Sequence, residues 1–142
     1  MKTQTTFPVR YAETDQMGIV HHSAYVPWLE MGRVDWLLAM GDSYAELEKS
    51  GIFFPVTAVA VSYRSPAHFG EIVTVETSLS GLKSRWLQFS YQVLGPGGLL
   101  ASATSEHITQ GQDGRAIRLP SELQQKLRNS LDSPDLNSLT SV

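Results

Sequence analysis

Residues 10–33 read RYAETDQMGIVHHSAYVPWLEMGR, and the rest of the chain is interpreted from this stretch. Residues 7–11 (FPVRY), which overlap its beginning, are mainly apolar and aromatic and predict a short strand. The polar run at residues 12–16 ends this strand, and Gly18 then permits a backbone conformation that a side chain would disfavour. The stretch therefore predicts a strand, a turn and a helix start in immediate succession.

A long helix is predicted from Tyr25, because apolar residues recur three or four positions apart until Gly41, a natural stop. The start of such a helix carries unpaired N–H groups and a partial positive charge. Residues 22–24 supply these N–H groups, and Asp15 stands a few residues upstream. A carboxylate facing a cluster of amide donors provides two of the parts that ester or thioester hydrolysis requires.

The spacing of six residues resembles the signature of the hotdog-fold acyl-CoA thioesterases, in the 4-hydroxybenzoyl-CoA thioesterase branch. These residues are Asp15, Gly18, Val20, Tyr25, Glu30 and Arg33. The resemblance covers residues 7–119, and residues 63–71 (YRSPAHFGE) are similar to the family's link between its second and third strands. It implies an α+β hotdog fold, in which a largely antiparallel β-sheet of about five strands wraps around one long central helix.

The downstream pattern agrees with this architecture. Four segments rich in β-branched or alternating apolar residues predict strands, at residues 56–63, 72–79, 86–94 and 99–109. Short helices are predicted at residues 44–49, after a cap at Asp42 or Ser43, and from Pro120 onward. Because the strands are joined mostly by short links, we expect the sheet to be antiparallel.

The chain is expected to form one domain. Its 142 residues suit a single core, residues 1–6 are predicted to be a loose end, and the hotdog domain is assigned to residues 1–130. The small, polar residues 131–142 are predicted to be a flexible tail.

Composition narrows the function classes. With 11 basic and 14 acidic residues the net charge is −3, which offers no basic footprint for nucleic acid. The absence of cysteine removes thiol nucleophiles and thiolate metal sites. No targeting signal and no apolar run of membrane-spanning length is apparent, so a cytoplasmic location is expected.

The resemblance also implies a mechanism. Asp15 would act as general base or nucleophile, while the backbone N–H of His22 would polarise the thioester carbonyl. Without the motif, the commoner interpretation of Asp15 is a turn-forming residue that bonds nearby amides. Glu13 is interpreted as solvated, and Glu30 remains a competing base because a related branch carries its catalytic Glu on this helix.

Other residues are given roles in the same way. Substrate-binding positions are Gly18, Val20, Tyr25 and Trp28, and coenzyme A-binding positions are Arg64, Ser65, Lys83 and Arg85. No metal is expected, because adjacent residues such as His21 and His22 diverge and no HxxxH spacing accompanies them. Glu30 and Arg33 are predicted to pair on the helix surface, and His107 to be structural.

The expected partners follow from the family. The substrate would be an acyl-CoA or acyl-carrier-protein thioester, with coenzyme A as part of the substrate and no separate cofactor. Two subunits would join their sheets in a homodimer or homotetramer. Two alternatives stay open, namely a non-catalytic acyl-CoA binding module and a hotdog dehydratase or hydratase. The acyl group, whether aromatic, short or long, is left open too.

Overall fold

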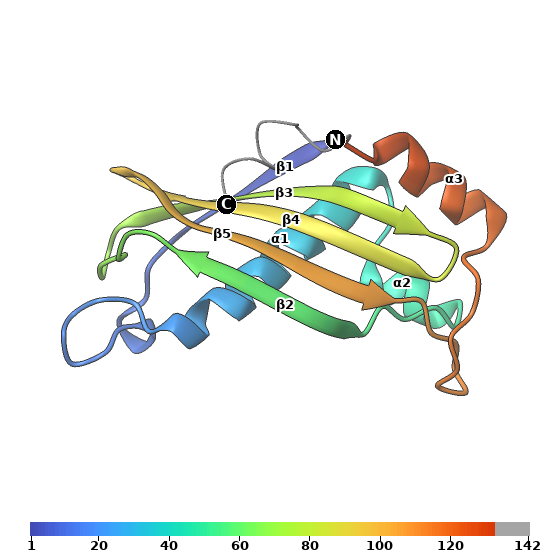
Figure 1. Cartoon of the computed structure of the whole chain (residues 1–142), viewed down its shortest axis with the longest axis horizontal. Coiled ribbons are helices and arrows are strands. Elements are labelled where there is room, and N and C mark those ends of the chain that lie inside the picture. The colour runs from blue at the N-terminus through green and yellow to red at the C-terminus, as the bar shows by residue number, and fades with distance from the viewer. Residues whose placement is uncertain (133–142) are drawn as a thin grey trace.

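The computed structural model describes residues 1–132, which form one antiparallel sheet with a long helix against one face (Figure 1). The strand order is β1-β3-β4-β5-β2. The strands are β1 (Lys2–Pro8), β2 (Val56–Tyr63), β3 (Ile72–Lys83), β4 (Trp86–Gly95) and β5 (Gly98–Ile108). The helices are α1 (Tyr25–Met40), α2 (Tyr44–Lys49) and α3 (Ser121–Ser130), with 3₁₀ turns η1 (Tyr11–Glu13) and η2 (His22–Ala24). The hotdog fold predicted from the sequence is confirmed.

The first strand differs from its prediction. The predicted loose end at residues 1–6 is wrong, because β1 begins at Lys2 and pairs with β3 in a register that sets Thr3 against Thr77. Its polar residues suit an edge strand, in which alternate side chains face solvent. Thr5 Oγ1 also donates to Asp35 Oδ2 of α1 at 2.7 Å, so this strand lies against the helix.

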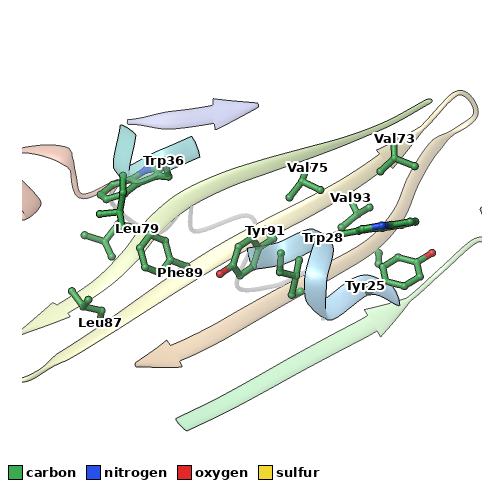
Figure 2. Close-up of a cluster of buried hydrophobic side chains, with 14 of the residues drawn as sticks. Tyr25, Trp28, Trp36, Val73, Val75, Leu79, Leu87, Phe89, Tyr91 and Val93 are labelled. Atoms are coloured by element: carbon green, nitrogen blue, oxygen red, sulfur yellow. The ribbon is translucent and has the colours of Figure 1, made fainter. Parts of the chain in front are cut away.

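Helix α1 is held in the curve of the sheet by its apolar face, as Figure 2 shows for Tyr25, Trp28 and Trp36. These three side chains are almost fully buried. The facing side chains come from β3 and β4 and include Val73, Val75, Leu79, Leu87, Phe89, Tyr91 and Val93. The helix ends where predicted, because Gly41 takes a left-handed conformation with φ of 99°.

The predicted surface pair of Glu30 and Arg33 is wrong. Arg33 is only 7% exposed, and its Nη1 donates to the Tyr91 hydroxyl at 3.1 Å across the core. Among the residues that the structure describes, Arg33 forms no salt bridge. Helical periodicity places residue 33 beside the apolar face of α1, whereas the charge of an arginine favours exposure to solvent. The prediction followed the charge.

The smaller helices agree with the sequence. Ser43 Oγ accepts a hydrogen bond from Glu46 N at 3.1 Å and so caps α2. In α3, Leu123 and Leu127 are buried, and the chain then returns to β3, where Asp132 N donates to Leu79 O at 3.0 Å. Of the predicted flexible tail, Leu131 and Asp132 are held by backbone hydrogen bonds, while residues 133–142 lie outside the described residues.

Hydropathy gives one further finding. No helix within residues 1–132 has the length and apolar character needed to cross a membrane.

Candidate active site

A cavity of about 320 Å³ lies between the loop that precedes α1 and the end of β2. Its walls come from two segments that are about 45 residues apart in sequence. The lining residues are Asp15, Ile19, Val20, His21, His22, Tyr25, Tyr63, Arg64, Ser65 and Pro66. The structure therefore brings the predicted carboxylate and the predicted helix start into one cavity.

The loop that carries Asp15 is a tight turn. Gly18 N donates to Asp15 O at 3.0 Å and Asp15 N donates to Ile19 O at 2.9 Å, with Gly18 at a φ of 80°. Asp15 Oδ1 accepts a hydrogen bond from Met17 N at 2.8 Å. This is the turn-forming role that the sequence left open, yet it uses one carboxylate oxygen. Within residues 1–132, Oδ2 accepts no hydrogen bond, and Asp15 is exposed at the cavity.

The loop is attached to the sheet link that follows β2. Val20 N donates to Ala67 O at 2.9 Å, and Ile19 forms a bridge with His68. The two cavity walls are therefore connected by backbone hydrogen bonds, which hold the loop that carries Asp15 against residues 67–68.

The helix start offers one free amide rather than three. Ser23 N donates to His21 Nδ1 at 3.2 Å, and Ala24 N donates to His21 O at 3.0 Å. The His22 amide, by contrast, has no backbone or side-chain acceptor among residues 1–132. It is the available donor at the point where the partial positive charge of η2 and α1 is concentrated.

Two tyrosines close the inner wall of the cavity. The Tyr63 hydroxyl donates to His22 O at 3.1 Å, and the rings of Tyr25 and Tyr63 meet edge to face at 5.0 Å. Burial raises the pKa of the Tyr25 hydroxyl, and the neighbouring Tyr63 adds to this rise. Tyr25 therefore stays protonated at neutral pH and forms a neutral wall.

The interpretation of Glu13 as solvated is wrong. Its side chain is 9% exposed, and it accepts hydrogen bonds from Arg10 N at 2.8 Å and from Trp28 Nε1 at 2.7 Å. The signal that could have found it is its position three residues after Arg10, because a Glu at the third position of a helical turn commonly reaches back to the amide before the turn.

The remaining predicted binding residues fall into two groups. Val20, Tyr25, Arg64 and Ser65 line the cavity, whereas Gly18 shapes the turn and Trp28 is fully buried behind Tyr25. Lys83 and Arg85 lie at the β3–β4 turn, at the opposite end of the sheet from Tyr63. One chain thus places two of the four predicted coenzyme A contacts at the cavity.

Metal ligation finds no support in the geometry of the described part of the chain. Within residues 1–132, no group of three or more His, Asp or Glu side chains is arranged to hold a metal ion. The rings of His21 and His22 lie 4.1 Å apart between centroids, with their planes tilted by 34°.

A second cavity of about 550 Å³ lies near the start of β2, and its walls include Glu30, Arg33, Tyr44, Phe54 and Val56. It is separated from the first cavity by the length of β2. The two cavities therefore occupy opposite ends of one edge strand.

Behind Arg33 a chain of buried hydrogen bonds crosses β4 and β5. Tyr91 Oη lies 2.6 Å from Ser105 Oγ, which lies 2.8 Å from His107 Nε2, and His107 Nδ1 lies 3.1 Å from Phe54 O. Burial lowers the pKa of His107 to about 4, with a further lowering from the Arg33 charge and an opposing effect of the bond to Phe54 O. His107 is accordingly neutral, in agreement with its predicted structural role.

Comparisons with known proteins match most of the chain. A family model described as the thioesterase-like superfamily matches residues 9–127. A Bacillus subtilis protein named putative acyl-CoA thioesterase YneP is 42% identical over 101 residues, which cover 70% of this chain and 73% of that protein. The crystal structure of a hypothetical protein from Thermus thermophilus superposes with a TM-score of 0.88 at 44% identity, covering 94% of this chain and 100% of that one. The DHNA-CoA thioesterase from Staphylococcus aureus superposes with a TM-score of 0.84 at 30% identity, covering 99% of this chain and 96% of that one.

Proposed function

The chain belongs to the thioesterase-like superfamily, and from this premise we propose that it is an acyl-CoA thioesterase, which hydrolyses a thioester to a free acid and coenzyme A. The observation that carries the proposal is the cavity lined by both Asp15 and His22. Asp15 has a free carboxylate oxygen and His22 a free amide, as far as residues 1–132 are concerned. A base and an amide donor that share one cavity suit attack on an acyl carbon.

In the proposed mechanism the acyl carbonyl lies against the start of α1. The His22 N–H donates to the carbonyl oxygen and stabilises the negative charge that develops there. Asp15 either removes a proton from a water, whose oxygen bonds to the acyl carbon, or bonds to that carbon itself and forms an anhydride that water later opens. In both routes the carbon–sulfur bond breaks with its electron pair on sulfur, and the proton from water reaches the thiolate.

The leaving group explains why so few groups are needed. A thiol such as that of cysteine has a pKa of about 8.5, so the thiolate departs without a strong general acid. A base and an oxyanion donor are therefore sufficient parts for the reaction. The mechanism routes no step through a metal or a separate cofactor.

Substrate binding is proposed to use both charge and the cavity walls. Arg64 and Ser65 line the cavity and are proposed to contact the coenzyme A part of the substrate, because an Arg suits phosphate through its fixed fork of donors. The acyl-carrier-protein thioester remains the alternative substrate, because its acyl-proximal arm is the same. The cytoplasmic location expected from the sequence stays a prediction.

We further propose a homodimer, or a tetramer of two such dimers, formed through β2. This strand is an edge, paired with β5 on one side, and its exposed residues include Val56, Val59 and Tyr63. An exposed apolar edge strand favours pairing with another chain. An antiparallel pairing of two β2 strands would set the first cavity of one subunit beside the second cavity of the other. The same pairing would bring the partner's Lys83 and the partner's Arg85, at the far end of the partner's sheet, toward the first cavity.

The activity test is an acyl-CoA panel, from aromatic to long aliphatic groups, assayed with a dye that detects free thiol. We expect thiol release from at least one substrate, and its loss in Asp15→Asn. A matched control is Asp113→Asn, because Asp113 Oδ1 accepts Arg115 N at 3.1 Å in another exposed turn, as Asp15 does for Met17. The control should keep full activity.

Two further measurements separate the alternatives, neither of which would release thiol. A binding module would bind acyl-CoA, measured by calorimetry, and release no thiol. A dehydratase would change the double-bond content of the acyl chain while leaving the thioester intact. An active Asp15→Asn would exclude Asp15 as the base and direct attention to Glu30.

A further inference from the structure

Glu13 occupies an unusual position for an acidic residue in a surface loop. Its side chain is 9% exposed, and each carboxylate oxygen has a separate donor: Oε1 accepts from Arg10 N at 2.8 Å, and Oε2 accepts from Trp28 Nε1 at 2.7 Å. Arg10 Nη2 adds a contact to Oε2 at 3.4 Å. Glu13 does not line the first cavity, so it does not touch a substrate held there.

Glu13 also holds the backbone on the opposite side. Its carbonyl oxygen accepts a hydrogen bond from His21 N at 2.8 Å, and the next residue, Thr14, forms a bridge with Val20. The side chain of Glu13 thus binds α1, and its main chain binds the segment that leads to η2. Asp15 follows Glu13 by two residues, and His22 follows His21 by one.

The anchor at Trp28 is rigid. Trp28 has no exposed surface, and its indole ring contacts Tyr25 at 4.7 Å and Phe7 at 5.3 Å between centroids. A residue bonded to this ring takes its position from the core rather than from the mobile surface. A carboxylate with two charge-assisted hydrogen bonds is well suited to transmit that position.

We propose that Glu13 is a positioning residue, which sets the distance and orientation between the Asp15 carboxylate and the His22 amide by bonding both of their chain segments to Trp28. This inference rests on the proposed hydrolysis for its kinetic consequence. The structural part of the proposal, that Glu13 fixes the positions of Asp15 and His21, does not depend on the reaction.

A carboxylate is required at this position because both of its partners are donors. The amide of a glutamine has one acceptor oxygen and one NH₂ group, so it would satisfy one donor and oppose the other. Glu13→Gln keeps the size of the side chain and removes one of the two bonds. Misplacement of a reacting group by about 1 Å can cost about 100-fold in rate.

The test compares Glu13→Gln with the wild type by kinetics and by NMR. We expect kcat to fall about 10- to 100-fold with a change in KM of less than about threefold, because the bound substrate keeps its contacts while the base and the amide lose their alignment. The indole N–H signal of Trp28 should shift, and the amides of Asp15 and His21 should exchange with solvent faster. Unchanged kcat with a shifted Trp28 signal would overturn the positioning role.

Two controls separate this role from a loss of fold. Glu122→Gln removes an exposed carboxylate from α3, far from the site, and should change neither kcat nor the Trp28 signal. The double variant Glu13→Gln/Trp28→Phe should be no slower than Trp28→Phe alone, because without the indole N–H the glutamine oxygen has only the Arg10 N–H left to satisfy. Additive losses in kcat would overturn the proposal.

The experiments distinguish failure of the proposed thioesterase function from failure of the proposed positioning role of Glu13. If the wild type released no thiol from any substrate, the proposed function would fall, and amide exchange would still decide the geometric claim. Faster exchange at Asp15 and His21 in Glu13→Gln would support it. Unaltered exchange at both amides would overturn it.

Discussion

The hydroxyl of Tyr63, the last residue of β2, donates a hydrogen bond to the carbonyl oxygen of His22 at 3.1 Å. This bond joins the edge strand to the residue whose amide is free at the start of α1. The strand proposed to form the dimer and the proposed oxyanion donor are therefore linked directly. A disturbance of β2 is expected to reach the site through this bond.

Tyr63→Phe tests this link. Loss of one hydrogen bond costs about 0.5–1.5 kcal/mol of stability, so we expect the melting temperature to fall by a few degrees. A loss of the same free energy from the alignment of the His22 amide lowers kcat about 2- to 12-fold. Steady-state kinetics with the best substrate of the panel measures the effect. Tyr11→Phe is the matched control, since the Tyr11 hydroxyl is exposed and makes no hydrogen bond within residues 1–132. Equal rates for Tyr63→Phe and the wild type would contradict the link.

Gly32→Ala tests the contact between α1 and β3. A Cβ at Gly32 would overlap Thr77 Oγ1 and would make a tight contact of 3.1 Å with Val75 Cγ1, so the Thr77 side chain would have to move. We expect a loss of about 1–3 kcal/mol in the free energy of unfolding, measured by urea denaturation. The double variant with Thr77→Ala should recover part of that loss. If the two substitutions were simply additive, this contact would not be the cause.

His107 predicts a pH dependence of stability. Its pKa is lowered by burial to about 4 in the folded chain, against 6.5 when unfolded. Between these values the unfolded chain binds a proton that the folded chain does not. The free energy of unfolding should therefore fall as the pH drops from about 6.5 to about 4, by about 3 kcal/mol. Above about pH 6.5, His107 should add no pH dependence to the free energy of unfolding.

The comparison variant for that prediction is His107→Gln, which has no titrating group. Urea denaturation between pH 4 and 7 should give a shallower decline for the variant than for the wild type. Curves of equal slope would mean that His107 is not the responsible group.

Val59→Lys tests the proposed β2 interface. Val59 is 38% exposed on the edge strand, and a lysine there would place like charges opposite each other in a self-paired strand. We expect sedimentation analysis to show a dimer for the wild type and a monomer for the variant, with loss of thiol release. Ile72→Lys, at a residue 52% exposed on β3, should remain dimeric. A monomeric wild type would remove the basis for the interface.

Much of the fold could be predicted because its signals are local. The range of α1 follows from helical periodicity and Gly41, and α2 follows from the Ser43 cap. The strand at residues 56–63 was predicted with its exact limits, since β-branched residues fill it. The start of β1 could not be read in this way, because a threonine-rich edge strand has the composition of a loose end until β3 is beside it.

In the candidate site, too, the local features could be predicted and the long-range contacts could not. Asp15, Gly18 and His22 are close in sequence, and their spacing was sufficient to identify a turn before a helix. The resemblance pointed to the His22 amide as the donor. That the Ser23 and Ala24 amides are already bonded could not be predicted, because it depends on the positions of the His21 side chain and carbonyl. The burial of Glu13 depends on Trp28, 15 residues away.

The amino-acid sequence by itself determined the succession of strands and helices along the chain, the sharp turn at Gly18 and the family to which the chain belongs. These depend on residues near one another in the chain. Only the tertiary structure decided that residues 15–25 and 63–66 share a cavity, that Arg33 is buried against Tyr91, and that Glu13 bonds to Trp28. Each of these depends on contacts that exist only after α1 has packed against the sheet, where burial and hydrogen-bond geometry override the preferences of the isolated residue.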